Sequence, residues 1–374
     1  MKFTIQSETL SAALNWLLKV VSSKTVMPVT ESIRFDAAGG KLTATATDGE
    51  ATLVVPLEAK DVKDGTACIP ASILGDFIKA LPGGMELVFD DNGSAGALNR
   101  MVVTYAGGKA ELCIFDADTW PAAARVEDDE ILSVDGKRLG RALAIALGSI
   151  GEDPLRPTLG AIYLNFGPEG LDVVGTDSKE IVISALPGAF TPKQALLPKK
   201  TGIILKTILD SKEQDIEVRT DGNAVEVILP SCTLSTRLVA GKYPTYRSVI
   251  PSADGLRTLT IPTDELCSAL KTVDSVTSGG TPFVKLTLDS LCVTVEGEDI
   301  GGNARAQETV SGTYDGEAVV LGFSAKKLLK LLTRVGGEEV SIRVRDPKSA
   351  VLITPVQEKE GLSVLAVLMP VYVH

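Results

Sequence analysis

Two alternating patterns of hydrophobic and polar residues run along the chain. Segments such as KLTATAT and LCVTVEG alternate apolar and polar positions, which is typical of strands with one buried face. Other segments place apolar residues three and four positions apart, which is typical of amphipathic helices. This spacing predicts six helices, at residues 8–24, 70–81, 135–149, 199–213, 264–274 and 324–334.

The order of these elements repeats three times. Leu10, Leu139 and Leu266 occupy matching positions in three strand–helix segments, which gives a period of roughly 128 residues, far longer than that of a solenoid. A second helix recurs within each repeat, and runs rich in Val, Thr and Ile separate the two helices. The sequence therefore predicts an α+β fold of three repeated domains, each with two helices packed on antiparallel sheets. The predicted domains are residues 1–126, 127–254 and 255–374.

Composition indicates a folded protein outside the membrane. Of 374 residues, 44% are hydrophobic and 23% are charged, which excludes wholesale disorder. No apolar run reaches the length of a membrane span, and MKFTIQSETL lacks the apolar stretch of a signal peptide. We expect a soluble cytoplasmic protein.

The residues that usually carry catalysis are scarce. The one histidine is His374, and the five cysteines are far apart and never in CxxC spacing. The chain has no GxxxxGK[ST] loop, no GxSxG and no HExxH. We therefore expect no enzymatic activity, no catalytic residues, no metal and no cofactor.

Charge is unevenly distributed. The chain carries a formal charge of −11, but the six predicted helices sum to about +7, which leaves about −18 elsewhere. Such segregation fits a basic surface for a polyanion on an acidic body. Lysines on solvated helix faces would produce the same sum, so charge alone leaves both interpretations open.

Several motifs together resemble one family. These are MKFTI, TATDGEATLVV, FDADTWP, VVGTDSKEIVIS, LVAGKYPTYRSVIP and AVLMPV. Over its whole length the chain resembles the bacterial sliding clamp, the beta subunit of DNA polymerase III. The resemblance implies a head-to-tail homodimer closed into a ring around double-stranded DNA. It also implies a cytoplasmic, nucleoid-associated processivity factor that an ATP-driven clamp loader places on DNA. Its other implied partners are the polymerase III catalytic subunit and other polymerases and repair proteins that carry clamp-binding peptides.

The resemblance implies three sets of site residues. A DNA contact or a solvated surface role fits each of the candidate DNA-binding positions, which are Lys24, Arg141, Arg156, Lys199, Lys200, Lys206, Arg247, Lys271 and Lys330. An apolar pocket for partner peptides, between the second and third domains, would comprise Leu159, Thr176, Ile181, Pro244, Val249, Val367, Leu368, Met369 and Pro370. The dimer interface would include Ala110, Leu112 and Val276.

The chain departs from the family pattern at these sites. Ser178-Lys179-Glu180 replaces the usual Gly-His-Arg, which predicts altered peptide specificity, and Glu152-Asp153 stands where polar or basic residues are common. Ala110 replaces a bulkier aromatic residue, which predicts a dimer that dissociates more readily. Whether the chain is the main replicative clamp or a diverged copy stays open. The alternatives are a clamp-fold scaffold that binds partners without encircling DNA, and an enzyme on a repeated α+β scaffold.

Overall fold

A computed structural model describes residues 1–22, 27–91, 100–128, 130–209, 215–252, 254–277, 283–299, 302 and 304–372. Each of the six predicted helices is present, with ends that differ from the prediction by a few residues. They are α1 (Ser7–Val20), α2 (Ala71–Ala80), α3 (Gly136–Leu147), α4 (Lys199–Leu209), α5 (Thr263–Val276) and α6 (Ala325–Val335). The candidate DNA-binding residue Lys24 lies outside the described residues.

One compact unit comprises residues 1–136 and 207–238. It holds two antiparallel sheets. The five-stranded sheet has the order β5 (Lys60–Lys63), β1 (Lys2–Gln6), β7 (Glu86–Asp90), β8 (Arg100–Tyr105) and β9 (Gly108–Cys113). The eight-stranded sheet has the order β10 (Leu132–Asp135), β15 (Asp215–Thr220), β16 (Ala224–Leu229), β17 (Cys232–Arg237), β4 (Ala51–Leu57), β3 (Lys41–Thr47), β2 (Ser32–Ala38) and β6 (Gly65–Pro70).

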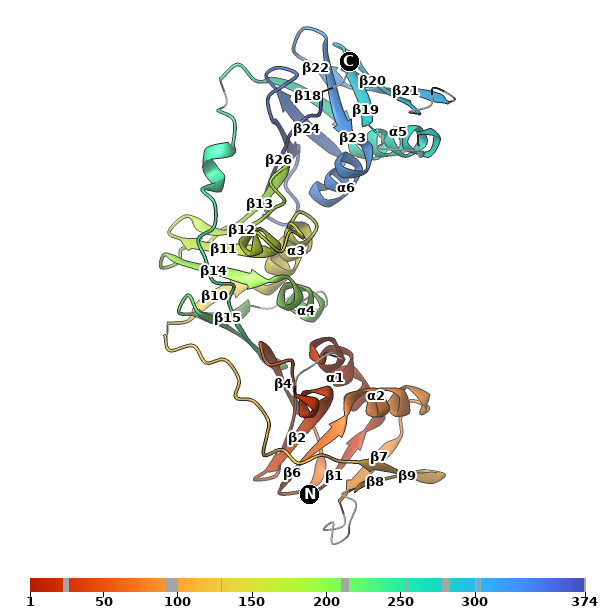
Figure 1. The fold of residues 1–374 in the computed structure, drawn as a ribbon, viewed down its shortest axis with the longest axis vertical. Coiled ribbons are helices and arrows are strands. Elements are labelled where there is room, and N and C mark those ends of the chain that lie inside the picture. Colours follow the sequence, from red (N-terminus) through yellow and green to blue (C-terminus); the bar gives the residue numbers. More distant parts are fainter. Residues whose placement is uncertain are drawn as a thin grey trace. The chain divides into compact units, whose positions relative to one another are not determined.

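The core of this unit lies between the sheets and the pair α1 and α2, which pack side by side (Figure 1). Leu10, Leu14 and Leu17 of α1 are buried at helical spacing. Phe3 and Phe89 stack with their ring centroids 4.7 Å apart, and both rings are fully buried.

The other compact unit comprises residues 137–206 and 239–374, and it also holds two antiparallel sheets. The nine-stranded sheet has the order β14 (Lys193–Pro198), β11 (Ala161–Gly167), β12 (Gly170–Thr176), β13 (Glu180–Leu186), β26 (Ser363–Leu368), β25 (Val351–Pro355), β24 (Glu339–Val344), β18 (Arg257–Pro262) and β22 (Thr313–Tyr314). The four-stranded sheet has the order β21 (Arg305–Ser311), β20 (Cys292–Glu298), β19 (Phe283–Leu288) and β23 (Val319–Ser324). In Figure 1, α5 and α6 lie side by side next to these strands.

The threefold repeat seen in the sequence is present in the fold. In each repeat, the strand before the first helix pairs antiparallel with the strand after the second helix. The three pairs are β1 with β7, β10 with β15, and β18 with β24. The α+β fold of repeated helix pairs on antiparallel sheets is therefore confirmed.

The sheets do not stop at the predicted domain boundaries. Pairing of β17 with β4 joins strands from either side of residue 126, and pairing of β13 with β26 joins strands from either side of residue 254. Backbone hydrogen bonds therefore continue across both predicted boundaries, and the chain forms two compact units. The three domains at residues 1–126, 127–254 and 255–374 stay a prediction.

Helix α3 packs on one face of the nine-stranded sheet, and a glycine allows its close approach. A Cβ atom on Gly175 of β12 would lie 2.4 Å from the carbonyl oxygen of Ala146 in α3, so only glycine fits there. Because side chains alternate along a strand, Val174 and Thr176 point to the opposite face. That opposite face carries the candidate site.

Candidate functional site: an apolar pocket on the nine-stranded sheet

The face of the sheet opposite α3 carries a cluster of aromatic and aliphatic side chains, which we call the tyrosine face. Tyr163 lies opposite Val174, and Ile181 lies opposite Val367, so these four residues share it. Residues 239–252, the covering segment, pack over part of the tyrosine face. The ring of Tyr243 stacks on Tyr163 with centroids 4.5 Å apart.

A buried carboxylate fixes the covering segment to the sheet. The hydroxyl of Tyr246 donates to Asp172 Oδ2 at 2.5 Å, and Arg247 Nη2 donates to the same atom at 2.7 Å. Hydrogen bonds with Tyr246 and Asp172 raise the pKa of Arg247, so this residue stays charged. The ion pair between Arg247 and Asp172 therefore holds the covering segment in register over β11 and β12. Burial raises the pKa of the neighbouring Tyr163 to about 12, which keeps its hydroxyl neutral.

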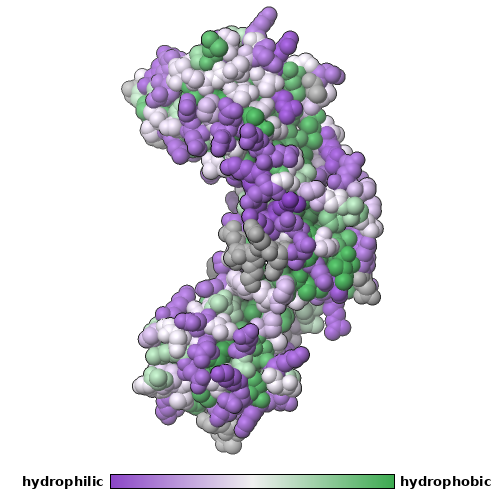
Figure 2. All heavy atoms as spheres, turned by 180° about the vertical axis from the view of Figure 1, so that it is seen from behind, coloured by the Kyte–Doolittle hydropathy of each residue, from purple (hydrophilic) through white to green (hydrophobic). Residues whose placement is uncertain are grey.

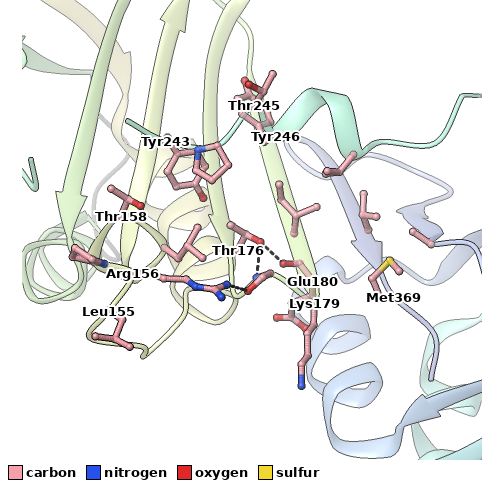
Figure 3. Close-up of a pocket in the computed structure, with 18 residues that line it drawn as sticks. Leu155, Arg156, Thr158, Thr176, Lys179, Glu180, Tyr243, Thr245, Tyr246 and Met369 are labelled. Carbon is pink, nitrogen blue, oxygen red and sulfur yellow. Dashed lines mark hydrogen bonds between the residues drawn. The ribbon is translucent and has the colours of Figure 1, made fainter. Parts of the chain in front are cut away.

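A cavity of about 590 Å³ opens between the covering segment, the start of β11 and the β12–β13 turn (Figure 3). It is lined by seven of the nine predicted pocket residues, namely Leu159, Thr176, Ile181, Pro244, Val249, Val367 and Met369. Two predicted residues do not line it. Leu368 follows Val367 on β26 and so points to the other face, where it is buried, and Pro370 follows Met369 outside the lining.

Several lining residues were not predicted from the sequence. They are Leu155, Arg156, Pro157, Thr158, Tyr243, Thr245, Tyr246 and Ala350. Ser178, Lys179 and Glu180, from which the sequence predicted altered peptide specificity, also line the cavity. Their positions depend on how loops pack, which hydrophobic periodicity does not report. The run KYPTYR did offer a signal, because two tyrosines flank Pro244 and Thr245 in a segment without strand or helix spacing. Arg156 was predicted to bind DNA, but it lies at the rim of the pocket.

A hydrogen-bonded turn forms one wall of the pocket. Thr176 Oγ1 donates to the carbonyl of Glu180 at 2.6 Å, and the backbone amides of Lys179 and Glu180 donate to Asp177 Oδ1 at 2.9 Å. The turn places Ser178 at a φ of 73°, in the left-handed region. Thr176 and Asp177 thus fix the backbone of Ser178-Lys179-Glu180, which replaces the usual Gly-His-Arg of the family pattern.

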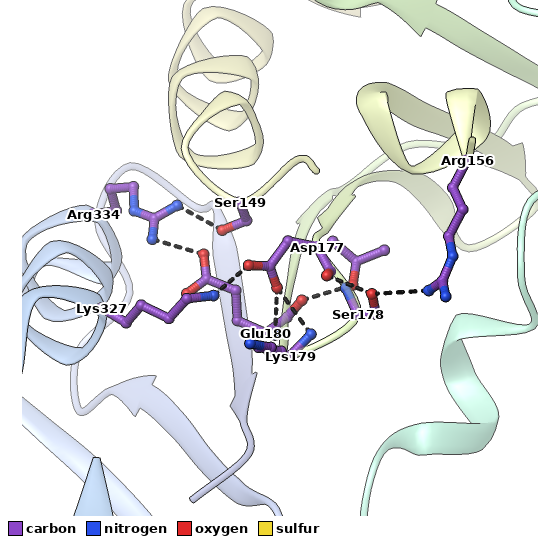
Figure 4. A network of polar contacts seen from close by, with 9 residues as sticks. Ser149, Arg156, Asp177, Ser178, Lys179, Glu180, Lys327 and Arg334 are labelled. Atoms are coloured by element: carbon purple, nitrogen blue, oxygen red, sulfur yellow. Dashed lines mark hydrogen bonds and ion pairs between the residues drawn. The ribbon is translucent and has the colours of Figure 1, made fainter. Parts of the chain in front are cut away.

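Helix α6 neutralises the acidic residues of this turn (Figure 4). Arg334 Nη2 lies 3.0 Å from Glu180 Oε1, while its Nη1 donates to Ser149 Oγ at 2.6 Å. Lys327 pairs with Asp177. Burial raises the pKa of Asp177, but hydrogen bonds from Lys327 and from the backbone amides of Glu180 and Lys179 outweigh it, and the pKa is lowered. Each carboxylate of the turn is therefore paired with a cation of α6.

The candidate DNA-binding residues occupy different surroundings. Lys206, Lys271 and Lys330 lie on helices α4, α5 and α6, and no acidic side chain among the described residues lies within ion-pair distance of them. Lys199 and Lys200 begin α4, and Lys199 pairs with Glu152 at 2.7 Å. Arg141 on α3 lies 3.6 Å from Glu360.

Arg156 and Arg247 lie apart from the helix cations. Arg156 lines the pocket, and Arg247 is bonded to Asp172, on the sheet face opposite α3. For all of these residues, contact with DNA stays a prediction. As a group, however, the six helices carry a net charge of +8 within a chain of −11. The charge segregation expected from the sequence is thus present in the observed helices.

The candidate interface residues lie on an edge strand and at the end of a helix. Ala110 and Leu112 belong to β9, which is an edge strand of the five-stranded sheet. Ala110 is half-buried and Leu112 is buried. Val276 ends α5 and is exposed. An edge strand has unpaired backbone groups and can extend its sheet with a second chain, but dimer contact stays a prediction.

The described residues hold no group of three or more His, Cys, Asp or Glu side chains placed to bind a metal ion. In the same part of the chain, no helix has both the length and the apolar character needed to cross a bilayer. Figure 2 shows a mosaic in which hydrophilic residues are interspersed with small hydrophobic patches on the face drawn.

Comparison with known proteins places this fold in one family. A family model described as the N-terminal domain of the DNA polymerase III beta subunit matches residues 1–121, and one described as its C-terminal domain matches residues 247–372. The beta sliding clamp of Caulobacter vibrioides is 26% identical over 362 residues, covering 94% of this chain and 95% of that protein. That of Synechocystis is 24% identical over 394 residues, covering 99% of each.

Solved structures show the same fold. A sliding clamp from Pseudomonas aeruginosa, bound to griselimycin, superimposes with a TM-score of 0.92 at 22% identity and full coverage of both chains. The beta sliding clamp of C. crescentus superimposes with a TM-score of 0.89 at 25% identity, covering 100% of this chain and 99% of that one.

Proposed function

Because the chain belongs to the DNA polymerase III beta subunit family, we propose that it is a DNA sliding clamp, a processivity factor without chemistry of its own. Two copies close head to tail into a ring around duplex DNA. The ring tethers the replicative polymerase, and the clamp loader opens and closes it. The protein acts in the cytoplasm, on the nucleoid.

The segregation of charge carries the DNA-binding part of this proposal. Helix cations such as Lys206, Lys271 and Lys330 supply a basic surface on a chain whose net charge is −11. A ring needs only weak attraction to phosphates, because enclosure prevents escape and tight contacts would stop sliding. The modest helix charge suits this requirement.

The pocket on the tyrosine face supplies the site for partners. Ile181, Val249, Val367 and Met369 form an apolar cavity, and the flexible Met369 side chain suits related but unequal ligands. We propose that peptides from the polymerase, the clamp loader, and other polymerases and repair proteins insert apolar side chains here.

A second candidate is a clamp-fold scaffold that binds partners without encircling DNA. The ion pairs that engage Lys199, Arg141 and Arg247 favour it, because they occupy cations that would otherwise face phosphates. The small Ala110 side chain at the candidate interface also favours it.

Retention on circular DNA separates the two candidates. Labelled protein is incubated with nicked circular plasmid, a clamp loader and ATP, and the DNA-bound fraction is isolated by gel filtration. The sliding clamp stays on the circle and is lost after a restriction enzyme linearises the DNA. A scaffold would bind DNA no better when the loader is present or when the DNA is circular. That result would reject the proposed function.

A further inference from the structure

Three cations at the start of helix α3 converge on the tip of the hairpin that joins β25 and β26. Lys137 Nζ lies 3.1 Å from Glu360 Oε1, and Arg141 Nη1 lies 3.6 Å from Oε2 of the same carboxylate. Arg138 Nε donates to the backbone carbonyl of Glu360 at 2.7 Å, and Arg141 Nη1 donates to the carbonyl of Lys359 at 3.4 Å. One acidic residue and the carbonyl before it therefore engage all three cations.

The backbone of the hairpin tip favours these contacts at a cost in conformation. Glu360 and Gly361 both lie in the left-handed region, with φ of 60° and 66°. Glycine adopts this conformation more readily than glutamate does, because glutamate has a Cβ atom. A Cβ atom at position 361 would lie 3.0 Å from Arg138 Nη2, so the glycine there leaves room for the guanidinium. A side chain held in the left-handed region where it meets three cations is typical of a functional position.

The contacts at the tip can exchange with another anion. The side chains of Lys137 and Glu360 are 45% and 46% exposed, and that of Arg141 is 27% exposed. Ion pairs this accessible to water contribute little to stability and are screened by salt. A phosphodiester carries one negative charge and two free oxygens, as a carboxylate does, and arginine binds both groups through paired hydrogen bonds. The three cations therefore suit a phosphate of a nucleic acid as well as they suit Glu360.

We propose that Lys137, Arg138 and Arg141 form a binding site for a phosphate of duplex DNA, and that Glu360 occupies this site until the phosphate replaces its carboxylate. This proposal rests on the proposed function and adds regulation of its DNA-binding surface. Because Glu360 belongs to the same chain, it competes at a high effective concentration. DNA in free solution displaces it poorly, whereas a duplex enclosed by the proposed ring presents phosphates continuously. Glu360 thus limits binding of nucleic acid before the ring is loaded.

Fluorescence anisotropy with the full-length protein and a short labelled duplex tests the proposal, in Hepes buffer at low salt. Glu360→Gln keeps the size of the side chain and removes the charge that holds the cations. We expect this variant to bind the duplex about three- to tenfold more tightly than the parent protein, and the gain to shrink as salt is raised.

The matched control is Glu358→Gln, which changes the net charge by the same amount at an exposed position of the same hairpin. Among the described residues, the Glu358 carboxylate makes no ion pair with α3. We expect this control to change duplex affinity by less than about twofold, because exposed charges at a distance are screened.

A double-mutant cycle identifies the cations. Lys137→Gln with Arg138→Gln should weaken duplex binding by less than about twofold in the parent protein, whose site is occupied, and should cancel the gain from Glu360→Gln. Hydrogen exchange supplies a readout independent of affinity. Amides of residues 356–362 should exchange faster when the parent protein is saturated with the duplex, because the tip leaves α3.

The other results overturn the proposal in distinguishable ways. Equal duplex binding by the Glu360→Gln and Glu358→Gln variants, or a gain that survives loss of Lys137 and Arg138, would overturn it, and retention on circular DNA would still test the proposed function. Inorganic phosphate that competes as well as the duplex at equal phosphate concentration would show a site for free phosphate and would overturn the assignment to DNA. Absence of duplex binding in every variant would overturn the proposal too. If retention on circular DNA is also absent, the proposed function fails with it.

Discussion

Three turns of the chain share one pattern of Thr and Asp hydrogen bonds, but they differ at a single position. Thr47-Asp48 and Thr220-Asp221 bond their own turns as Thr176-Asp177 does. The next residue has positive φ in all three, and it is Gly49, Gly222 or Ser178. Only the pocket turn therefore places a side chain in the left-handed region.

Replacement of Ser178 by glycine should raise stability slightly. Relief of left-handed strain contributes about 1–2 kcal/mol, and the greater freedom of glycine in the unfolded chain costs about 0.5–1 kcal/mol. We expect a net gain of about 1 kcal/mol or less, measured as a higher urea midpoint. Gly222→Ser, the reverse change in the matching turn, should lower the midpoint. A lower midpoint for Ser178→Gly would mean that the serine hydroxyl stabilises the turn more than its backbone strains it.

Asp177 links the pocket turn to α6 in a pH-dependent way. Its folded pKa is lowered, so its carboxylate stabilises the fold above the unfolded pKa near 4 and loses that effect as pH falls through the folded value. Asp177→Asn should cost about 1–3 kcal/mol at pH 7. It should also flatten the loss of stability between about pH 5 and pH 2. Thermal unfolding across this range measures both, and parallel acid profiles for the variant and the parent would contradict the assignment.

Among the elements, the helices were the easiest to predict. Their apolar residues recur at local spacings, as with Leu328, Leu331, Leu332 and Val335 of α6, so each helix is encoded by its own residues. The exact ends were harder, because they depend on caps and on neighbouring turns. Helix α1, for example, ends at Val20, earlier than predicted.

We propose that edge strand β9 lies at the dimer interface and that Ala110 weakens it. Ala110 contributes little apolar area there, and filling the position with an aromatic side chain should add about 1–2 kcal/mol of association free energy. We expect the parent protein to show monomer by analytical ultracentrifugation at submicromolar concentration, and Ala110→Phe to shift the equilibrium towards dimer. A parent protein without detectable monomer, or an Ala110→Phe variant that dissociates more readily, would contradict this role for β9.

At the scale of the whole molecule, the distribution of charge matters more than its total. A net charge of −11 would oppose DNA, yet the six helices together carry +8. Attraction to DNA must therefore act over short distances, since the Debye length is only about 8 Å at physiological salt. In the proposed ring, enclosure and not affinity would account for retention on DNA.

Reversal of helix charge should impair loading on DNA. Changing Lys206, Lys271 and Lys330 together to Glu lowers the net charge of the helices by about six units, and we expect loading at 50 mM salt to slow by about an order of magnitude. The difference should narrow at 200 mM salt. The same triple change at Lys41, Lys60 and Lys63, which are exposed on strands, is the control. If loading on DNA slowed equally in both triple variants, the cause would be the net charge of the protein and not the charge of the helices.

The amino-acid sequence by itself determined the six helices, the threefold repeat and the concentration of positive charge on the helices. These properties depend on residue order within one segment, and local periodicity reports them directly. It also pointed to seven of the residues that line the pocket, because their motifs resemble those of one family.

Only the tertiary structure decided how the pocket is closed and charged. The pocket brings together distant parts of the chain because β13 pairs with β26 and the covering segment crosses the tyrosine face. Its lining includes Leu159, Ile181, Tyr243, Ala350 and Met369. The pairing of Glu180 with Arg334 spans 154 positions in the chain. Contacts over such separations arise when strand pairing brings distant segments together, and no local pattern records them.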